Sequence, residues 1–255
     1  MSAMSEAMAS NGFSSANEYE FQDNQPSSVS AGILKKSSFS TAHPLQPYAW
    51  TAREPDGLTR IFDPGIQVVR WQRQEDQAIR AYFQQSLASG ALDNGFRTIM
   101  SVEERLRPAL LPNLPGQSVV VDDICRLSAL YSELLGCDAI GLRLEVLHSA
   151  MCPRFHVDRT GIRLACTYLG SGTEWIDDRW VDHSKLGLGS NGVSDEVSGL
   201  YDHRTMVEAA APFDVVFFKG LLWQGNNGRG AIHRSPAVAP GSEPRVLLVI
   251  DAIWN

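Results

Sequence analysis

The sequence contains no apolar stretch close to the ~20 residues that a membrane-spanning helix requires, and its longest apolar run lies at residues 246–250. Residues 1–10 lack the basic and apolar regions of a secretory signal. The four cysteines form no CxxC pair, which argues against a disulfide scaffold and a zinc ribbon. These absences predict a cytoplasmic protein without a membrane segment.

Positive charge is also scarce, because 22 Lys and Arg residues stand against 29 Asp and Glu residues, for a net charge of −7. This balance disfavours the many phosphate contacts through which proteins bind nucleic acid. The chain has no Walker loop, no GxGxxG fingerprint and no serine in a GxSxG elbow. We therefore expect a small molecule or a protein side chain as the substrate. The sequence carries no signal for an oligomeric state.

The composition divides the chain into a tail and one domain. Residues 1–46 are rich in Ser, Ala, Asn and Gln, and their apolar residues are isolated, which predicts a disordered tail. Residues 47–255 have the composition of a single domain. Within it, residues 47–138 are predicted to be mainly helical support, and residues 139–255 a β-rich core that binds a metal.

Three helices are predicted in the first half of the domain. Apolar residues at helical spacing predict a helix over residues 74–87, and a similar stripe from Val120 to Leu134 predicts another that ends at Gly136. Between them, the sequence Ser-Val-Glu-Glu at residues 101–104 resembles a capping box. It predicts a helix that begins near Ser101 and stops before Pro112.

The second half of the domain favours strands. Short segments with alternating or β-branched apolar residues are separated by turn residues, and residues 176–203 form a polar, glycine-rich excursion. The predicted strands are residues 66–71, 140–148, 154–158, 162–169, 205–210, 214–219, 231–235 and 245–251. This pattern predicts an α+β domain whose core is a β-sandwich or barrel of the jelly-roll or cupin type, supported by N-terminal helices.

A candidate metal site follows from the strand predictions. His156 and Asp158 are two residues apart on a predicted strand, so their side chains would point to the same face. His233 opens a later strand and is the candidate for a third ligand. Two histidines and one carboxylate form the facial triad of non-haem Fe(II) oxygenases, which leaves three metal positions open for substrate and oxygen.

Several segments resemble a known family. From Gly141 to Asp251 the sequence resembles the double-stranded β-helix of Fe(II)/2-oxoglutarate dioxygenases, through FHVD (155–158), RLACTYLG (163–170), PFDVVFFKG (212–220), AIHRSP (231–236) and PRVLLVIDA (244–252). The resemblance implies Fe(II) bound by His156, Asp158 and His233. It also implies that 2-oxoglutarate is held through its distal carboxylate by Arg245, because a guanidinium binds a carboxylate with two parallel hydrogen bonds.

Residues 152–175 show a closer resemblance, to an uncharacterised bacterial family catalogued as domain of unknown function 1826. That resemblance covers about residues 50–255 and implies no established activity. Arg234, next to His233, is a second candidate for binding the co-substrate.

Three other interpretations fit the same residues. The ligands could hold zinc without catalysis, with Cys152, four residues before His156, as a further ligand. A cupin-like enzyme could use the metal without 2-oxoglutarate. The segment could also be an interaction domain that binds no metal.

Overall fold

The computed structural model describes residues 47–202, 204–239 and 241–254. The predicted tail at residues 1–46 lies outside the described residues. No helix in the described ranges combines the length and the apolar character needed to cross a membrane.

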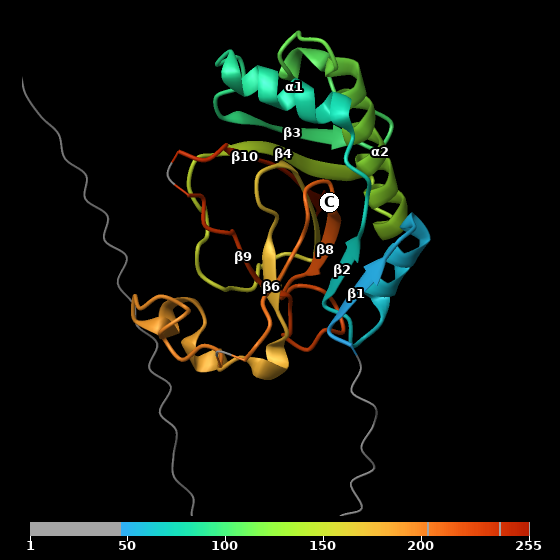
Figure 1. Cartoon of the computed structure of the whole chain (residues 1–255). Helices are drawn as coiled ribbons and strands as arrows, with labels where there is room; N and C mark the ends of the chain where they lie inside the picture. Colours follow the sequence, from blue (N-terminus) through green and yellow to red (C-terminus); the bar gives the residue numbers. More distant parts are fainter. Residues whose placement is uncertain (1–46, 203, 240, 255) are drawn as a thin grey trace, which may run out of the picture. The chain divides into compact units, whose positions relative to one another are not determined.

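In the described ranges, ten strands form two sheets, whose arrangement Figure 1 shows. The major sheet has the order β1-β2-β8-β5-β10-β4-β3 and the minor sheet the order β7-β6-β9. The strands are β1 (Ala49–Ala52), β2 (Val68–Trp71), β3 (Gly95–Ser101), β4 (Ala139–Leu147), β5 (Ile162–Leu169), β6 (Glu174–Ile176), β7 (Glu208–Ala209), β8 (Val215–Lys219), β9 (Ile232–Arg234) and β10 (Arg245–Ile253).

The connection of the two sheets confirms the predicted double-stranded β-helix. Strands β4, β5, β8 and β10 lie together in the major sheet, and an isolated antiparallel bridge from His156 to His233 adds a further position beside β9 of the minor sheet. From β4 to β10 the chain passes repeatedly between the sheets, and these strands pair antiparallel. This is the topology of a jelly roll. With the helices below, the fold class is α+β.

Alternation along the strands gives the major sheet two different faces. On β5, Leu164, Cys166 and Tyr168 belong to a large core that includes residues of both helices. Ala165, between them, belongs to a second core with Trp175 of the minor sheet. Figure 1 shows α1 and α2 on one side of the major sheet and β6 and β9 on the other. The space between the two sheets is where inward-facing polar residues can form a site.

The first and third predicted helices are confirmed. Helix α1 (Gln77–Ala88) begins after Asp76, whose carboxylate accepts hydrogen bonds from the backbone N–H groups of Ala78 and Ile79. Those bonds satisfy donors that the first helical turn leaves free. Helix α2 (Gln117–Leu135) ends at Gly136, whose φ of 65° is the left-handed conformation that glycine adopts without strain.

The second predicted helix is wrong. Ser101 ends strand β3. Between Ser101 and Pro112 the only helical segment is a short 3-10 turn, Pro108–Leu110. Half of the capping box forms, since the Ser101 N–H donates to the Glu104 carboxylate. It closes a turn instead of a helix, because pairing with β4 holds the backbone extended up to Ser101 and the proline at 108 disfavours helical geometry in the residue before it.

Other strand boundaries differ from the predictions. The predicted strand at 154–158 is reduced to the bridge at His156, and the one at 205–210 to the two residues of β7. Strands β1, β3 and β6 have no counterpart among the predicted strands. The excursion contains three short 3-10 segments, Asp178–Trp180, His183–Lys185 and Gly187–Ser190. They are single helical turns and do not form a further domain.

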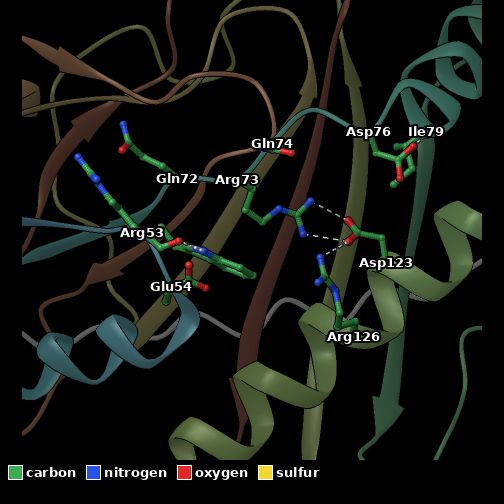
Figure 2. Close-up of a pocket in the computed structure, with 10 residues that line it drawn as sticks. Arg53, Glu54, Gln72, Arg73, Gln74, Asp76, Ile79, Asp123 and Arg126 are labelled. Carbon is green, nitrogen blue, oxygen red and sulfur yellow. Dashed lines mark hydrogen bonds and ion pairs between the residues drawn. The ribbon is translucent and has the colours of Figure 1, made fainter.

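A buried ion pair fastens α2 to the segment after β2 (Figure 2). The Arg73 guanidinium donates to both carboxylate oxygens of Asp123, at 2.9 and 3.0 Å. Tyr168 and Arg126 donate to the same carboxylate. These groups flank an open pocket of about 470 Å³ that contains none of the predicted site residues. Burial by itself would raise the pKa of Asp123, but the hydrogen bonds and charge of Arg73 outweigh it and lower this pKa.

Replacing Asp123 with asparagine is expected to reduce the free energy of unfolding by about 3 kcal/mol, because it leaves the buried Arg73 charge without a partner. The Asp122→Asn variant is the matched control on the same helix, since that exposed carboxylate faces an exposed Arg105 and its loss should cost less than about 1 kcal/mol. Urea denaturation measures both.

The lowered pKa of Asp123 also sets the sign of a pH dependence. Its ionised form stabilises the folded state above the unfolded-state pKa of about 4, and that stabilisation is lost as the pH falls further toward the folded-state pKa. The difference between wild type and Asp123→Asn should therefore be full at pH 7 and shrink below pH 4. A difference that is constant with pH would contradict this account.

Candidate metal centre

The structure brings the three predicted ligands together between the sheets. His156 lies on the bridge to β9, Asp158 follows it, and His233 is in the middle of β9. The Nε2 atoms of His156 and His233 lie 3.4 and 3.2 Å from different oxygens of Asp158. One ligand atom from each residue lies within 4.8 Å of the other two. The three donor atoms can therefore contact one ion.

Backbone carbonyls orient both imidazole rings. His156 Nδ1 lies 2.8 Å from the Arg154 carbonyl oxygen, and His233 Nδ1 lies 2.9 Å from the Ala231 carbonyl oxygen. A carbonyl oxygen only accepts hydrogen bonds, so each Nδ1 carries a proton and each Nε2 is the ring atom that faces Asp158 and could ligate a metal. This is the arrangement in which an outer-shell partner fixes the tautomer of a metal ligand. The His233 ring also stacks on Phe218, with 4.7 Å between centroids.

Asp158 is held in its ionised form. Burial would raise the pKa of this carboxyl group, but hydrogen bonds from His156 and His233 and the charge of Arg163 outweigh burial and lower it. Arg163 forms an ion pair with the Oδ2 atom of Asp158. A carboxylate that remains charged at neutral pH is the form that ligates a divalent cation.

Arg163 links the triad to β10 and had no role in the sequence predictions. Its Nε and Nη2 atoms donate to the two carboxylate oxygens of Asp251, at 2.8 and 2.7 Å. Arg163 thus fixes the position of Asp158 while Asp251 fixes Arg163. The signal in the sequence is an arginine at an inward-facing position of the otherwise apolar strand β5.

A residue of the excursion, Asp195, supports His156 from behind. One oxygen of its buried carboxylate accepts from Arg154 Nε at 2.8 Å, and the other accepts from the Phe155 backbone N–H at 2.7 Å. Asp195 therefore holds the two residues before His156, including the carbonyl that orients the His156 ring. The sequence analysis did not identify Asp195, because the excursion has no strand pattern and Asp195 is 41 residues from Arg154 along the chain.

Replacing Asp195 with asparagine is expected to weaken Co(II) binding about 10-fold, because an amide NH₂ would face one of two N–H donors and release the backbone that orients His156. The control is Asp182→Asn, an exposed aspartate of the same excursion that accepts from Ser184. The measurements are the Co(II) dissociation constant and the visible spectrum of the Co(II) form. Equal constants for wild type and Asp195→Asn would contradict the positioning role.

The predicted co-substrate residue Arg245 lines the same cavity as the triad. The cavity has a volume of about 160 Å³ and includes His156, Asp158 and His233 in its wall. Arg245 is only 2% exposed, and its guanidinium donates to the hydroxyl groups of Thr167, Thr173 and Ser235. Its Nε atom is buried without a hydrogen-bond partner among the described residues. Burial lowers the pKa of Arg245 to about 10.

The other candidate, Arg234, is already engaged. Its Nε atom donates to Glu174 and its Nη1 atom to Glu196, both at 2.7 Å, and its guanidinium lies over the Phe155 ring. Arg154, two residues before His156, is likewise engaged in an ion pair, with Asp195. Of the two predicted candidates, only Arg245 keeps a buried donor atom without a partner.

The family is decided by a match over most of the chain. A family model described as Protein of unknown function (DUF1826) matches residues 52–251. The chain belongs to this DUF1826 family. The match includes the triad, Arg245 and most of both sheets, so the candidate metal centre lies within the part of the chain that defines membership. No curated protein is similar enough in sequence to count as a match.

The solved structures to which the chain is similar include two dioxygenases for auxin oxidation and a prolyl-4-hydroxylase. The crystal structure of the rice dioxygenase for auxin oxidation covers 80% of this DUF1826 chain and 82% of its own, at 12% identity and a TM-score of 0.46. A Pseudomonas putida prolyl-4-hydroxylase covers 80% and 98%, at 13% identity and a TM-score of 0.40. The Arabidopsis thaliana auxin dioxygenase, in a complex with 2-oxoglutarate, covers 81% and 92%, at 8% identity and a TM-score of 0.45.

The zinc interpretation of the sequence named Cys152 as a further ligand. Cys152 is exposed at the wall of the metal cavity, but it is not part of the described group of three residues whose donor atoms converge. The donor set of this DUF1826 protein is thus two imidazoles and one carboxylate. That set is consistent with an Fe(II) site that keeps open positions.

Proposed function

We propose that the chain is a mononuclear Fe(II)/2-oxoglutarate-dependent oxygenase, with His156, Asp158 and His233 as the metal ligands and Arg245 as the residue that binds the distal carboxylate of 2-oxoglutarate. One observation carries the proposal: a facial donor set and a buried arginine with a free donor atom line one cavity of about 160 Å³.

The donor set supports iron over zinc. Structural zinc sites are closed by four ligands, often with cysteine, whereas two histidines and one carboxylate leave positions free. When bound, Fe(II) would supply the oxygen chemistry, and 2-oxoglutarate the electrons for it. Carbonyl groups hold both Nδ1 atoms and so direct both Nε2 atoms toward the metal position, and Arg163 pairs with the ionised Asp158.

Arg245 supports a dicarboxylic co-substrate. A buried guanidinium without an anionic partner is unfavourable, and burial lowers its pKa to about 10. A carboxylate that pairs with it would relieve that cost through charge-assisted hydrogen bonds. Thr173 and Ser235 lie on the same cavity wall and offer hydroxyl groups beside it. The chain's own role in co-substrate binding is therefore charge neutralisation and orientation.

Apolar side chains complete the cavity and exclude water from it. Ala165, Phe218, Leu247 and Val249 line the cavity, together with the exposed residues Met151 and Cys152. A dry wall strengthens the electrostatic interactions of the ligands and limits side reactions. The net charge of −7 supports a small molecule or a protein side chain as the oxidised substrate.

Anaerobic titration tests the proposal. Apo protein is titrated with Fe(II) and then with 2-oxoglutarate, and the visible absorption is recorded. We expect one equivalent of Fe(II) to bind and a weak charge-transfer band to develop on addition of 2-oxoglutarate, because the keto acid would chelate iron at the open positions. Exposure to oxygen should then form succinate.

Two results would overturn the proposal in different ways. Tight binding of zinc, with no response to 2-oxoglutarate, would indicate a metal-binding protein without this activity. Iron binding without a band and without succinate would indicate a cupin-like enzyme that does not use the keto acid.

A further inference from the structure

A second charged group in the metal cavity has a free position. Glu145 of β4 lines the cavity with the triad and is 5% exposed. Its Oε1 atom accepts from Arg97 at 2.6 Å and lies 3.7 Å from Arg143. Its Oε2 atom is buried and accepts no hydrogen bond from the described residues. A buried carboxylate oxygen without a hydrogen-bond donor destabilises the folded state, so a ligand that donates to this atom would be bound favourably.

The sheet register places Glu145 on the same face of the major sheet as Arg245. Glu145 pairs across the sheet with Leu247, and Leu247 and Arg245 are two residues apart on β10, so all three lie on the same face. Beyond β4 only β3 follows in the sheet. A co-substrate bound to Arg245 would therefore leave Glu145 facing the remaining space beside the metal.

Local charge indicates which donor fits. Arg97 and Arg143 already lie beside the Glu145 carboxylate, so its negative charge is balanced. A cationic ligand would place a third positive charge beside these two arginines. An uncharged N–H or O–H group would supply the missing hydrogen bond without adding charge.

We propose that Glu145 is a specificity residue for the oxidised substrate, whose Oε2 atom accepts a hydrogen bond from an uncharged donor, an amide N–H or a hydroxyl group, held next to the metal. This inference rests on the proposed oxygenase function. It adds what that function leaves open, namely the chemical group by which the substrate is recognised.

The Glu145→Gln variant gives a sharp test, because Arg97 is a donor and will select the oxygen of the new amide. The amide nitrogen then takes the place of Oε2 and turns an acceptor into a donor. Preference for a donor group on the ligand should consequently reverse in this variant. Glu243→Gln is the matched control, since Glu243 is an exposed glutamate two residues before Arg245.

The probes are N-methylacetamide, which has one N–H donor, and N,N-dimethylacetamide, which has none. Protein loaded with Mn(II), with and without 2-oxoglutarate, is mixed with each probe, and paramagnetic broadening of the probe methyl signals gives its affinity near the ion. Protein loaded with Zn(II) gives the diamagnetic baseline. We expect wild type and Glu243→Gln to bind N-methylacetamide at least about 5-fold more tightly than the dimethyl probe. Glu145→Gln should bind the dimethyl probe more tightly.

Equal affinity of wild type for the two probes would overturn the inference, as would an unchanged preference in Glu145→Gln. A further overturning result is a loss of 2-oxoglutarate affinity in Glu145→Gln without any probe preference in wild type, because Glu145 would then serve Arg245. Failure of 2-oxoglutarate to bind wild type would instead refute the oxygenase function, and the probe preference measured without 2-oxoglutarate would still decide the role of Glu145.

Discussion

Replacing Asp158 with asparagine is expected to weaken Fe(II) and Co(II) binding by at least about 100-fold. Asp158 is the anionic member of the donor set, and its oxygens lie 3.4 and 3.2 Å from the two histidine donors. Loss of an outer-shell partner of a metal typically costs 10- to 100-fold in affinity, and loss of a charged ligand should exceed that. Metal competition with a chromophoric chelator measures the constants.

A graded comparison separates ligation from general damage to the site. Asp251→Asn keeps all three ligands and removes one charge from the pair that holds Arg163, so it should weaken metal binding by only about 10-fold. Circular dichroism and thermal unfolding check that both variants are folded. If Asp158→Asn binds metal as well as Asp251→Asn does, the assignment of Asp158 as a ligand is refuted.

Replacing Arg245 with methionine is expected to weaken 2-oxoglutarate binding by at least about 100-fold while iron affinity stays unchanged. Of the two candidates, Arg245 has a buried donor atom without a partner among the described residues, whereas Arg234 is paired with Glu174 and Glu196. Truncating a buried charged partner leaves the opposite charge, here the distal carboxylate, desolvated and unpaired. The anaerobic charge-transfer band, titrated with 2-oxoglutarate in the presence of Fe(II), measures the effect.

The same variant should not lose stability through electrostatics. Because burial lowers the pKa of Arg245 to about 10 in the folded protein, well below its ordinary value in the unfolded chain, the folded state holds this proton less tightly than the unfolded state. The charge therefore costs folding energy at every pH below about 10, and methionine removes that cost. We expect the thermal midpoint of Arg245→Met to equal or exceed that of wild type.

Arg234→Met is the comparison for this prediction. It removes ion pairs with Glu174 and Glu196, so its thermal midpoint should fall, while its affinity for 2-oxoglutarate should change by less than about 3-fold. The opposite pattern, with weak 2-oxoglutarate binding in Arg234→Met and normal binding in Arg245→Met, would transfer the co-substrate role to Arg234.

Local sequence patterns were sufficient for much of the fold and for naming the three residues whose donor atoms converge. The apolar stripe from Val120 and the glycine at 136 predicted α2, and the short, mainly apolar segment 162–169 predicted β5 to the residue. The two-residue spacing of His156 and Asp158 places both side chains on one face even though the strand is only a bridge. Such patterns work because the periods of a helix and a strand are properties of a few neighbouring residues.

The capping box at Ser101 shows the limit of local pattern. Its hydrogen bond to Glu104 exists, but pairing of β3 with β4 decided the backbone conformation. Strand β3 lies at the edge of the sheet and its residues are mostly half-exposed or exposed, so it lacks the apolar alternation that identified β5.

The sequence by itself determined which residue types could form a metal site and which elements would carry them. Only the tertiary structure decided how the charges are paired: Arg163 with Asp158 and Asp251, Arg234 with Glu174 and Glu196, and Arg245 with no carboxylate in the described chain. The reason is physical. An ion pair depends on a few ångströms between groups that lie on strands brought together by sheet order, and sheet order is set by burial over the whole domain.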